Sequence, residues 1–324
     1  MDLTMVEAIN LALHEAMERD DAVTVLGEDV GVSGGVFRAT DGLHDAFGAK
    51  RAMDTPLAES AIAGMSVGMA LNGLRPVAEM QFSGFSYYAL AQIENHAARL
   101  RWRTRGGLGV PMVVRMPYGA GVRALEHHSE SREAFYAHMP GLKTVIPATP
   151  RRARALLHAA IRDPDPVIFM EPKASYRRFR ETVPEDDAPV ELGHARIARE
   201  GGDLTVVAWG AMLPRVLEAA EALAGEGTEA EVIDPETIAP LDAETIAASV
   251  GRTGRLLIVT EAPPSYGPAA EIAMRMIEED FYALRVPIRR VCGWDVHVPY
   301  FAREQAYLPT AARIEAAARN LLSS

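Results

Sequence analysis

The sequence predicts an α/β protein of two domains, each with a mostly parallel β-sheet flanked by helices. Short apolar segments alternate with helical segments along the chain, which is typical of a parallel sheet covered on both faces. The alternation is interrupted between Glu171 and Gly202 and then begins again. A length of 324 residues exceeds what one average core accommodates and suits two domains of ordinary size.

The first domain is expected over residues 1–180. Thr4-Met5-Val6-Glu7 has the pattern of a capping box, and apolar residues at helical spacing up to Met17 predict an amphipathic helix. Val23–Leu26 predicts a buried strand that ends at Gly27, before a glycine-rich loop at residues 31–35. Later buried strands are expected at Val77–Met80, Met112–Met116, Thr144–Ile146 and Val167–Met170. Helices are expected around Glu59–Asn72, Tyr87–Arg105 and Arg151–Arg162.

A charged region with several prolines, from Glu171 to Gly202, separates the two halves. We assign residues 181–202 to a linker, although a long surface loop of a single domain would have the same composition. The second domain, residues 203–324, repeats the alternation of strand and helix. Its strands are expected at Leu204–Trp209, Glu231–Ile233, Leu256–Val259 and Ile288–Val291. Its helices are expected at Met212–Ala224, Ala243–Ser249, Ala269–Asp280 and Thr310–Leu322.

Composition and charge narrow the location and the kinds of partner. The single cysteine, Cys292, excludes an intrachain disulfide and favours a reducing compartment. The first residues lack a signal-peptide pattern and no apolar run is long enough to span a bilayer, so no membrane association is expected. We expect a cytoplasmic protein, or a mitochondrial matrix protein if a transit peptide was removed. The net charge of −11 argues against nucleic acid as the main partner and favours simple solubility or a basic protein partner.

Several well-known catalytic motifs are absent from the sequence. It has no P-loop, no dinucleotide-binding fingerprint, no H-E-x-x-H and no G-x-S-x-G. His127 and His128 are the only histidine pair, and adjacent residues do not readily bind one metal ion. The chain also lacks a Gly-Asp-Gly triplet and adjacent asparagines, which together form the magnesium-diphosphate signature of thiamine diphosphate enzymes.

Eight short segments, in a specific order and spacing, carry a resemblance to a known family. They are Leu26–Asp29, Gly34–Phe37, Asp54–Glu59, Arg75–Glu79, His128–Ser131, Pro140–Lys143, Glu171–Lys173 and Tyr307–Thr310. The chain resembles, over almost its whole length, the β subunit of the thiamine-diphosphate-dependent component of 2-oxo acid dehydrogenase complexes (pyruvate or branched-chain type). This implies a transketolase-like pyrimidine-binding domain followed by a transketolase C-terminal-like domain. In the family the α subunit binds diphosphate and Mg²⁺, and the β subunit holds the aminopyrimidine ring, so the missing signature is expected.

Glu59 is the first candidate for a catalytic role. It precedes a helix made almost wholly of small residues, where a carboxylate either begins the helix or acts as an acid. The resemblance implies the second role, because Glu59 matches the family glutamate that shares a proton with ring nitrogen N1′ of the cofactor. Leu57 and Phe85 are apolar neighbours that we expect to desolvate Glu59 and raise its pKa.

Three further residues join Glu59 in the cofactor-binding set that the resemblance implies: Leu57, Gln81 and Phe85. Phe85 would pack against the pyrimidine ring, and Gln81 would hydrogen-bond cofactor or substrate. Core packing is the alternative for both side chains. His128 lies in a glycine- and proline-containing loop and matches a histidine that assists acyl transfer to lipoamide. A surface histidine without that role is the alternative.

The resemblance also implies a structural potassium ion, held largely by backbone carbonyl oxygens. The turn Asp163-Pro164-Asp165-Pro166 offers the hard oxygen ligands that such a cation prefers, although similar turns commonly end helices. The matching positions are Met112, Ala160, Ile161, Asp163 and Asp165.

Four positions depart from the family pattern. Glu130 replaces the usual glutamine, Arg132 replaces a frequent proline, and Gly84 and Ala91 replace frequent aspartates. Because Glu130 is close to His128 in the sequence, we expect its negative charge to raise the pKa of that histidine.

The main interpretation is a β subunit in an assembly of two α and two β chains. The assembly would decarboxylate a 2-oxo acid and reductively acylate a lipoyl group. The basic subunit-binding domain of the lipoyl acyltransferase core is the expected partner. A self-sufficient transketolase-like enzyme and a non-catalytic assembly subunit are the alternatives. The second domain resembles the family's assembly and docking domain, so no catalytic residue is expected there.

Overall fold

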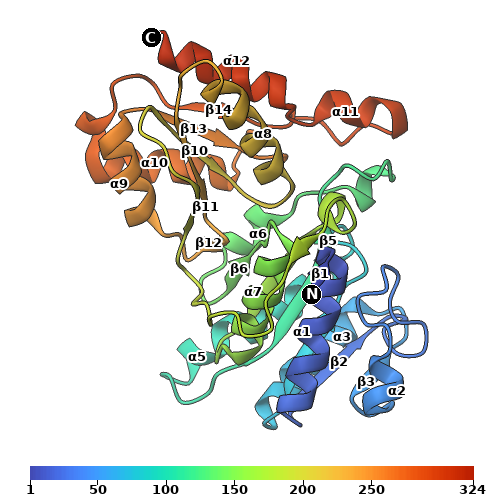
Figure 1. Ribbon diagram of the computed structural model, residues 1–324. Coiled ribbons are helices and arrows are strands. Elements are labelled where there is room, and N and C mark those ends of the chain that lie inside the picture. The colour runs from blue at the N-terminus through green and yellow to red at the C-terminus, as the bar shows by residue number, and fades with distance from the viewer.

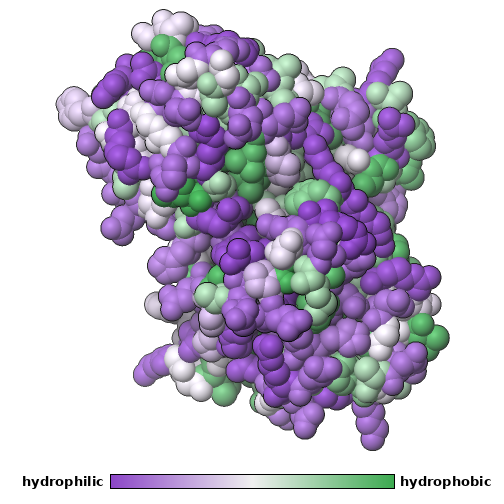
Figure 2. Space-filling view, in the orientation of Figure 1, coloured by the Kyte–Doolittle hydropathy of each residue, from purple (hydrophilic) through white to green (hydrophobic).

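Two parallel sheets, one in each half of the chain, organise the molecule into two lobes (Figure 1). The computed structural model describes residues 1–324. Figure 2 shows the two lobes with an indentation between them, and hydrophilic residues over most of this face. The predicted α/β class with two mostly parallel sheets is confirmed. No helix has the length and apolar character needed to cross a membrane.

The first sheet has seven strands in the order β12-β6-β7-β5-β4-β2-β3. Every neighbouring pair is parallel except β12 with β6. The central strands are buried on both faces, which explains why they have continuous apolar runs in the sequence. The strands are β2 (Val23–Gly27), β3 (Ala52–Asp54), β4 (Arg75–Glu79), β5 (Val113–Tyr118), β6 (Lys143–Val145), β7 (Val167–Pro172) and β12 (Thr237–Ala239).

Helices cover both faces of this sheet. The capping box predicted at Thr4 is present, since its backbone N–H and its hydroxyl both donate to the Glu7 carboxylate at 2.8 Å. α1 (Met5–Arg19) and α7 (Pro150–Arg162) share one core with the sheet, and α3 (Glu59–Leu71) belongs to the core on the other face. Shorter helices are α2 (Leu43–Phe47), α4 (Leu90–Gln92), α5 (Arg99–Arg103) and α6 (Glu133–Ala137).

The segment predicted as one helix at Tyr87–Arg105 is helical but changes type along its length. A 3₁₀ turn at Ser86–Tyr88 leads into α4, a π-helical stretch at Ile93–Ala98 and then α5. A π turn accommodates an extra residue and is a local feature that hydrophobic periodicity does not reveal.

The second sheet has five strands in the order β14-β13-β10-β11-β9, and only β9 is antiparallel to its neighbour. The strands are β9 (Arg196–Arg199), β10 (Leu204–Ala208), β11 (Ala230–Asp234), β13 (Leu256–Val259) and β14 (Arg289–Val291). The helices are α8 (Leu213–Ala224), α9 (Ala243–Thr253), α10 (Pro268–Asp280), α11 (Glu304–Tyr307) and α12 (Ala311–Leu322). β10, β11, β13 and β14 and the helices α8, α9, α10 and α12 agree with the predicted elements to within a few residues, whereas β9 and α11 were not predicted.

The two halves are joined by more than the connecting chain. Within residues 181–202, β8 (Glu181–Thr182) pairs with β1 (Asp2–Leu3), and β9 joins the second sheet. β12 leaves the second half and pairs with β6 at the edge of the first sheet. One apolar core is continuous from α3 through the first sheet to Trp209 and the second sheet. The second half is therefore positioned firmly against the first.

Candidate functional site

The predicted site residues are brought together by the parallel strands of the first sheet. Since β2, β4, β5 and β7 run in the same direction, their carboxyl ends meet at one edge. Glu28 follows β2, and Gln81 lies just after β4. The loop that leads to His128 follows β5, and Lys173 follows β7. This edge is where open α/β sheets bind ligands.

Glu59 begins α3 at the same edge, following β3, and its residue is only 7% exposed. The N-cap residue is Ala58, and no side chain caps the helix. Its carboxylate accepts no hydrogen bond from another group of the chain, so the structure gives no support to a simple capping role. A sheltered carboxylate without a partner is available to a ligand.

Glu28 is a second acidic residue beside Glu59. It was not among the site residues predicted from the sequence. Burial raises the pKa of Glu28, and the negative charges of Glu59, Asp29 and Glu79 raise it further. Its Oε1 atom is buried without a hydrogen-bond partner. The signal that would have found it is the pair Glu28-Asp29 directly after a buried strand.

Leu57 does not help to bury Glu59, contrary to the sequence prediction. It is 79% exposed because it lies in the turn before α3 and faces away from the core. Gln81 is half-buried, and its Nε2 donates to Asp29 Oδ2 at 3.2 Å. This hydrogen bond connects the segment after β4 to the segment after β2.

Phe85 and His128 lie in one aromatic cluster, although 43 positions separate them along the chain. Their ring centroids are 5.3 Å apart, and Phe82 lies 4.4 Å from His128 in an edge-to-face arrangement. Phe85 also lies 5.8 Å from His127. Phe85 is only half-buried, so part of its ring is accessible at the sheet edge. The cluster places an aromatic face next to an imidazole.

His128 is half-buried, and its Nδ1 atom is buried without a partner. Burial lowers the pKa of His128, and the charges of His127 and Lys173 lower it further. The predicted upward effect of Glu130 is therefore wrong. The Glu130 carboxylate accepts a hydrogen bond from Arg132 Nε at 2.9 Å, and this ion pair neutralises it.

A buried ion network supports the carboxyl ends of the central strands. Arg115 donates to Glu171 through Nε at 2.8 Å and through Nη2 at 2.7 Å, and it also contacts Glu79. All three side chains are almost fully buried. Burial raises the pKa of Glu79, and the negative charge of Glu171 adds to this effect while Arg115 opposes it.

The positions matched to a potassium ion lie in the last turn of α7, in the turn that follows it, and at Met112 directly before β5. The carbonyl of Ile161 accepts from Arg75 Nη1 at 2.9 Å, and that of Met112 accepts from the Val167 N–H at 3.0 Å. The Asp163 carboxylate pairs with Lys143, and the Asp165 carboxylate pairs with Arg101. Because a carbonyl oxygen has two lone pairs, the main-chain oxygens can still accept a cation.

Comparison with known proteins supports the resemblance. Residues 1–178 match the transketolase pyrimidine-binding domain, and residues 193–314 match the transketolase C-terminal domain. The chain is 48% identical to the pyruvate dehydrogenase E1 component subunit beta of Acholeplasma laidlawii, over 98% of each chain. The 2-oxoisovalerate dehydrogenase subunit beta of Bacillus subtilis is 46% identical, also over 98% of each chain. The chain belongs to the family of 2-oxo acid dehydrogenase β subunits.

A third relative is the 3-methyl-2-oxobutanoate dehydrogenase subunit beta of Mycobacterium tuberculosis. It is 48% identical to this chain, over 96% of this chain and 90% of its own length. Relatives named for pyruvate and for branched-chain acids thus match at nearly equal identity. A solved structure described as a split-gene transketolase in an inactive β4 tetramer has a TM-score of 0.83 and 24% identity, and it covers 100% of this chain and 99% of its own. That likeness supports the fold.

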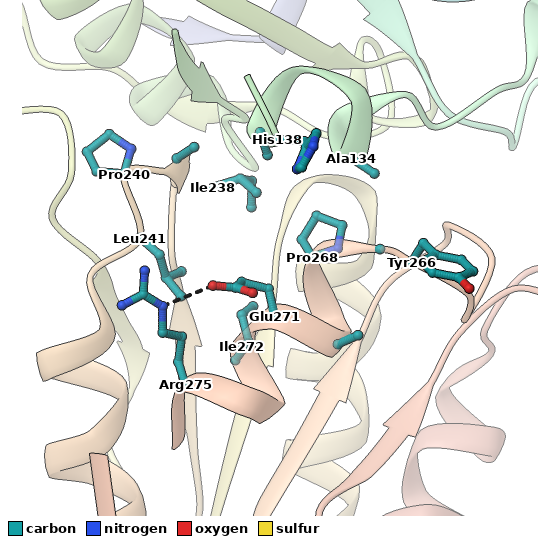
Figure 3. Close-up of a pocket in the computed structure, with 14 residues that line it drawn as sticks. Ala134, His138, Ile238, Pro240, Leu241, Tyr266, Pro268, Glu271, Ile272 and Arg275 are labelled. Carbon is teal, nitrogen blue, oxygen red and sulfur yellow. Dashed lines mark hydrogen bonds and ion pairs between the residues drawn. The ribbon is translucent and has the colours of Figure 1, made fainter. Parts of the chain in front are cut away.

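A separate cavity of about 520 Å³ lies between the two lobes of the β subunit (Figure 3). It is lined by α6 residues on one side and by Pro240, Leu241 and α10 on the other. In Figure 3, Glu271 and Arg275 of α10 form an ion pair, with Arg275 Nε and Glu271 Oε1 3.0 Å apart. None of the predicted site residues lines this cavity, so it is distinct from the sheet-edge site.

Proposed function

We propose that this chain supplies the aminopyrimidine-binding half of a thiamine diphosphate site. Together with an α subunit it oxidatively decarboxylates a 2-oxo acid, of the pyruvate or branched-chain type, and acylates lipoamide. The observation that carries the proposal is Glu59, a sheltered carboxylate without a partner at the carboxyl edge of the sheet. Family membership supports the same assignment.

The residues present fit an aminopyrimidine ring. Glu59 and Glu28 offer two carboxyl groups, and Glu28 Oε1 is buried and unpaired. Phe85 offers a half-exposed aromatic face. When bound, thiamine diphosphate supplies the nucleophilic carbon and the electron sink for decarboxylation. Glu59 would hold a proton at ring nitrogen N1′, and Phe85 would fix the plane of the ring.

Glu28 is well placed to support this role of Glu59. Burial raises the pKa of Glu28 and the negative charge of Glu59 raises it further, which supports an interaction between the two carboxyl groups. Two interacting acids in a sheltered site do not both ionise readily, and the raised pKa of Glu28 favours a proton on Glu28. Glu28 would thereby keep a proton close to the pair that Glu59 and N1′ would form.

His128 would move a proton during acyl transfer to the lipoyl group. Its pKa is lowered, so the imidazole is neutral near neutral pH and can accept a proton. Its position beside Phe85 places it next to the proposed ring site. The unpaired Nδ1 atom leaves one ring nitrogen without a competing partner in the chain.

The assembly would contain two α and two β chains. The α subunit would contribute the magnesium and diphosphate half of the site, because this chain has neither a Gly-Asp-Gly triplet nor adjacent asparagines. The lipoyl acyltransferase core would bind through its basic subunit-binding domain. The relatives are named as beta subunits, which supports the need for an α subunit as partner.

A structural potassium ion would be held by main-chain oxygens at Met112, Ala160, Ile161, Asp163 and Asp165. Both aspartate carboxylates already face basic side chains, so they would contribute their backbone carbonyls and not their side chains. A higher melting temperature of the assembly in KCl than in choline chloride of equal ionic strength supports this site. Equal melting temperatures in the two salts would contradict it.

Glu59→Gln tests the main proposal, because glutamine keeps the size of the side chain and cannot share the proton. With the α subunit present, we expect decarboxylation with an artificial electron acceptor to fall by about 10² to 10⁴-fold, with unchanged assembly by size-exclusion chromatography. The control is Glu18→Gln, which alters an exposed carboxylate on α1. Decarboxylation by Glu59→Gln within about 2-fold of the control would refute the assignment.

A further inference from the structure

The loop that carries His128 is bound by two carboxylates of the second domain. The backbone N–H of Ala120 donates to Glu261 Oε2 at 2.7 Å. The Gly121 N–H donates to Glu304 Oε1 at 2.9 Å, and the Arg123 N–H is shared between Oε1 at 3.1 Å and Oε2 at 3.0 Å. In Figure 1, α11, which begins at Glu304, lies beside this green loop.

Both carboxylates are buried, so these hydrogen bonds are strongly favoured. Glu304 is fully buried and Glu261 is 3% exposed. A buried carboxylate is costly unless hydrogen-bond donors compensate it, and hydrogen bonds to charged groups are stronger than neutral ones. The loop supplies main-chain donors to Glu261 Oε2 and to both Glu304 oxygens, while Glu261 Oε1 is buried without a hydrogen-bond partner. The loop therefore cannot move away without leaving two buried charges unsatisfied.

The backbone of the loop fits closely around these groups. Gly119 has a φ of +80°, and a Cβ built there would lie 2.6 Å from Glu261 Oε1. Lys173 is also buried and donates to the Gly119 carbonyl oxygen. Its charge interacts favourably with both Glu261 and Glu304. The start of the loop is thus enclosed by groups from both domains.

The far end of the loop is fixed within the first domain. The Gly119 N–H donates to the Glu130 carbonyl at 3.0 Å, which closes the loop, and Ser83 Oγ donates to the same carbonyl at 2.8 Å. Between these anchors, Glu126–His128 forms a 3₁₀ turn. His128 is therefore held at a fixed distance from the segments that Glu261, Glu304 and Ser83 bind.

We propose that Glu261 and Glu304 are positioning residues for His128, so that the second domain sets the geometry of acyl transfer without contacting the substrate. This inference rests on the proposed role of His128 in lipoyl acylation. It differs from a purely structural role, in which the two carboxylates only join the domains. A structural role predicts that every activity and the melting temperature fall together.

Glu304→Ala and Glu304→Gln form a matched pair. Glutamine keeps one oxygen that can accept from both N–H groups and loses only the second contact of Arg123 with Oε2, whereas alanine removes both oxygens. In the assembled α/β enzyme, Glu304→Ala should speed hydrogen exchange of residues 119–131 by about 10-fold or more. It should reduce lipoyl acylation by about 10-fold or more while decarboxylation with an artificial acceptor stays within about 3-fold. Glu304→Gln should restore lipoyl acylation and slow exchange.

If the alanine variant does not fold, Glu304→Asp replaces it in these assays. Aspartate keeps the negative charge, but its side chain is one methylene shorter, so its oxygens lie farther from the loop. The control is Glu271→Ala, an exposed carboxylate of α10. Unchanged loop exchange in Glu304→Ala, or an equal loss of both activities, would overturn the proposal. A His128→Ala variant with normal lipoyl acylation would contradict the role of His128, whereas loop exchange in Glu304→Ala would still decide whether Glu304 holds the loop.

Discussion

The carbonyl oxygen of His127 packs directly against the α-carbon of Gly84. A Cβ built at Gly84 would lie 1.8 Å from that oxygen, which is far inside van der Waals contact. The loop that carries His128 therefore reaches its position only because residue 84 has no side chain. The aspartate that the family resemblance implies at this position would have no room in this chain.

Gly84→Ala should displace the His128 loop. Since a misplacement of about 1 Å can reduce a rate by about 10²-fold, we expect a loss of that size in lipoyl acylation. Decarboxylation with an artificial acceptor should change much less. Steady-state assays of both reactions on the α/β assembly measure the split. Gly73→Ala is not a suitable control because Gly73 has a positive φ, whereas Gly68→Ala alters a glycine with no atom near its Cβ position. Equal acylation by Gly84→Ala and Gly68→Ala would contradict this expectation.

The pH dependence of lipoyl acylation should report the environment of His128. Because burial and the neighbouring charges lower its pKa, the acid limb of the profile should have a midpoint below 6.5. His127→Gln removes one of the charges that lower the pKa, so the midpoint should move upward towards 6.5. The measurement is the rate of acylation of a lipoyl domain between pH 5 and 8. His96→Gln, an exposed histidine, should leave the midpoint in place. A downward shift in His127→Gln would be inconsistent with the observed packing.

The site residues that could be predicted are those marked by local sequence patterns, whereas contacts between residues far apart along the chain could not be predicted. Glu59, Phe85 and His128 belong to segments with recognisable local patterns, and the parallel strands bring those segments to one edge. Glu304 is 183 positions from Gly121, and it lies in a short helix with no pattern of its own. Its contact depends on how the two domains pack, which no local signal records.

The central strands of both sheets, such as β2 and β10, could be predicted because they are buried on both faces and consist of apolar runs. The short strands β1, β8 and β9 could not, because they are two to four residues long and mostly half-exposed. The three-residue strand β12 is mostly buried, and its pairing with β6 depends on how the two halves of the chain pack. The prediction that Leu57 helps to bury Glu59 was wrong because Leu57 lies in a surface turn. An apolar residue in a turn can point outwards when the turn itself is at the surface.

Glu133 should make the stability of the chain depend on pH. Burial raises its pKa to about 7, whereas an ordinary glutamate has a value of 4.5. In this range the folded state binds more protons than the unfolded state, so stability falls as pH rises from 4.5 to about 7. The shift corresponds to a loss of about 3 kcal/mol. Glu133→Gln should remove this dependence, and urea unfolding at several pH values measures it. The same pH dependence in the variant would contradict the assignment.

Arg115→Met should strongly destabilise the first domain. The substitution leaves Glu79 and Glu171 buried without their cation, and loss of one partner from a buried ion pair typically costs about 3 to 5 kcal/mol. Chemical denaturation measures the change in the free energy of unfolding. Arg275→Met breaks an exposed pair and should change the free energy of unfolding far less. Equal effects of the two substitutions would show that the buried network is not needed for stability.

Binding of thiamine diphosphate tests most directly whether this chain holds half of a shared site. Calorimetric titration with Mg²⁺ present would compare the chain alone, its α subunit alone and the mixture. We predict tight binding only by the mixture, with weaker binding when the chain carries Glu59→Gln. Tight binding by this chain alone would contradict the account and favour a self-sufficient transketolase-like enzyme.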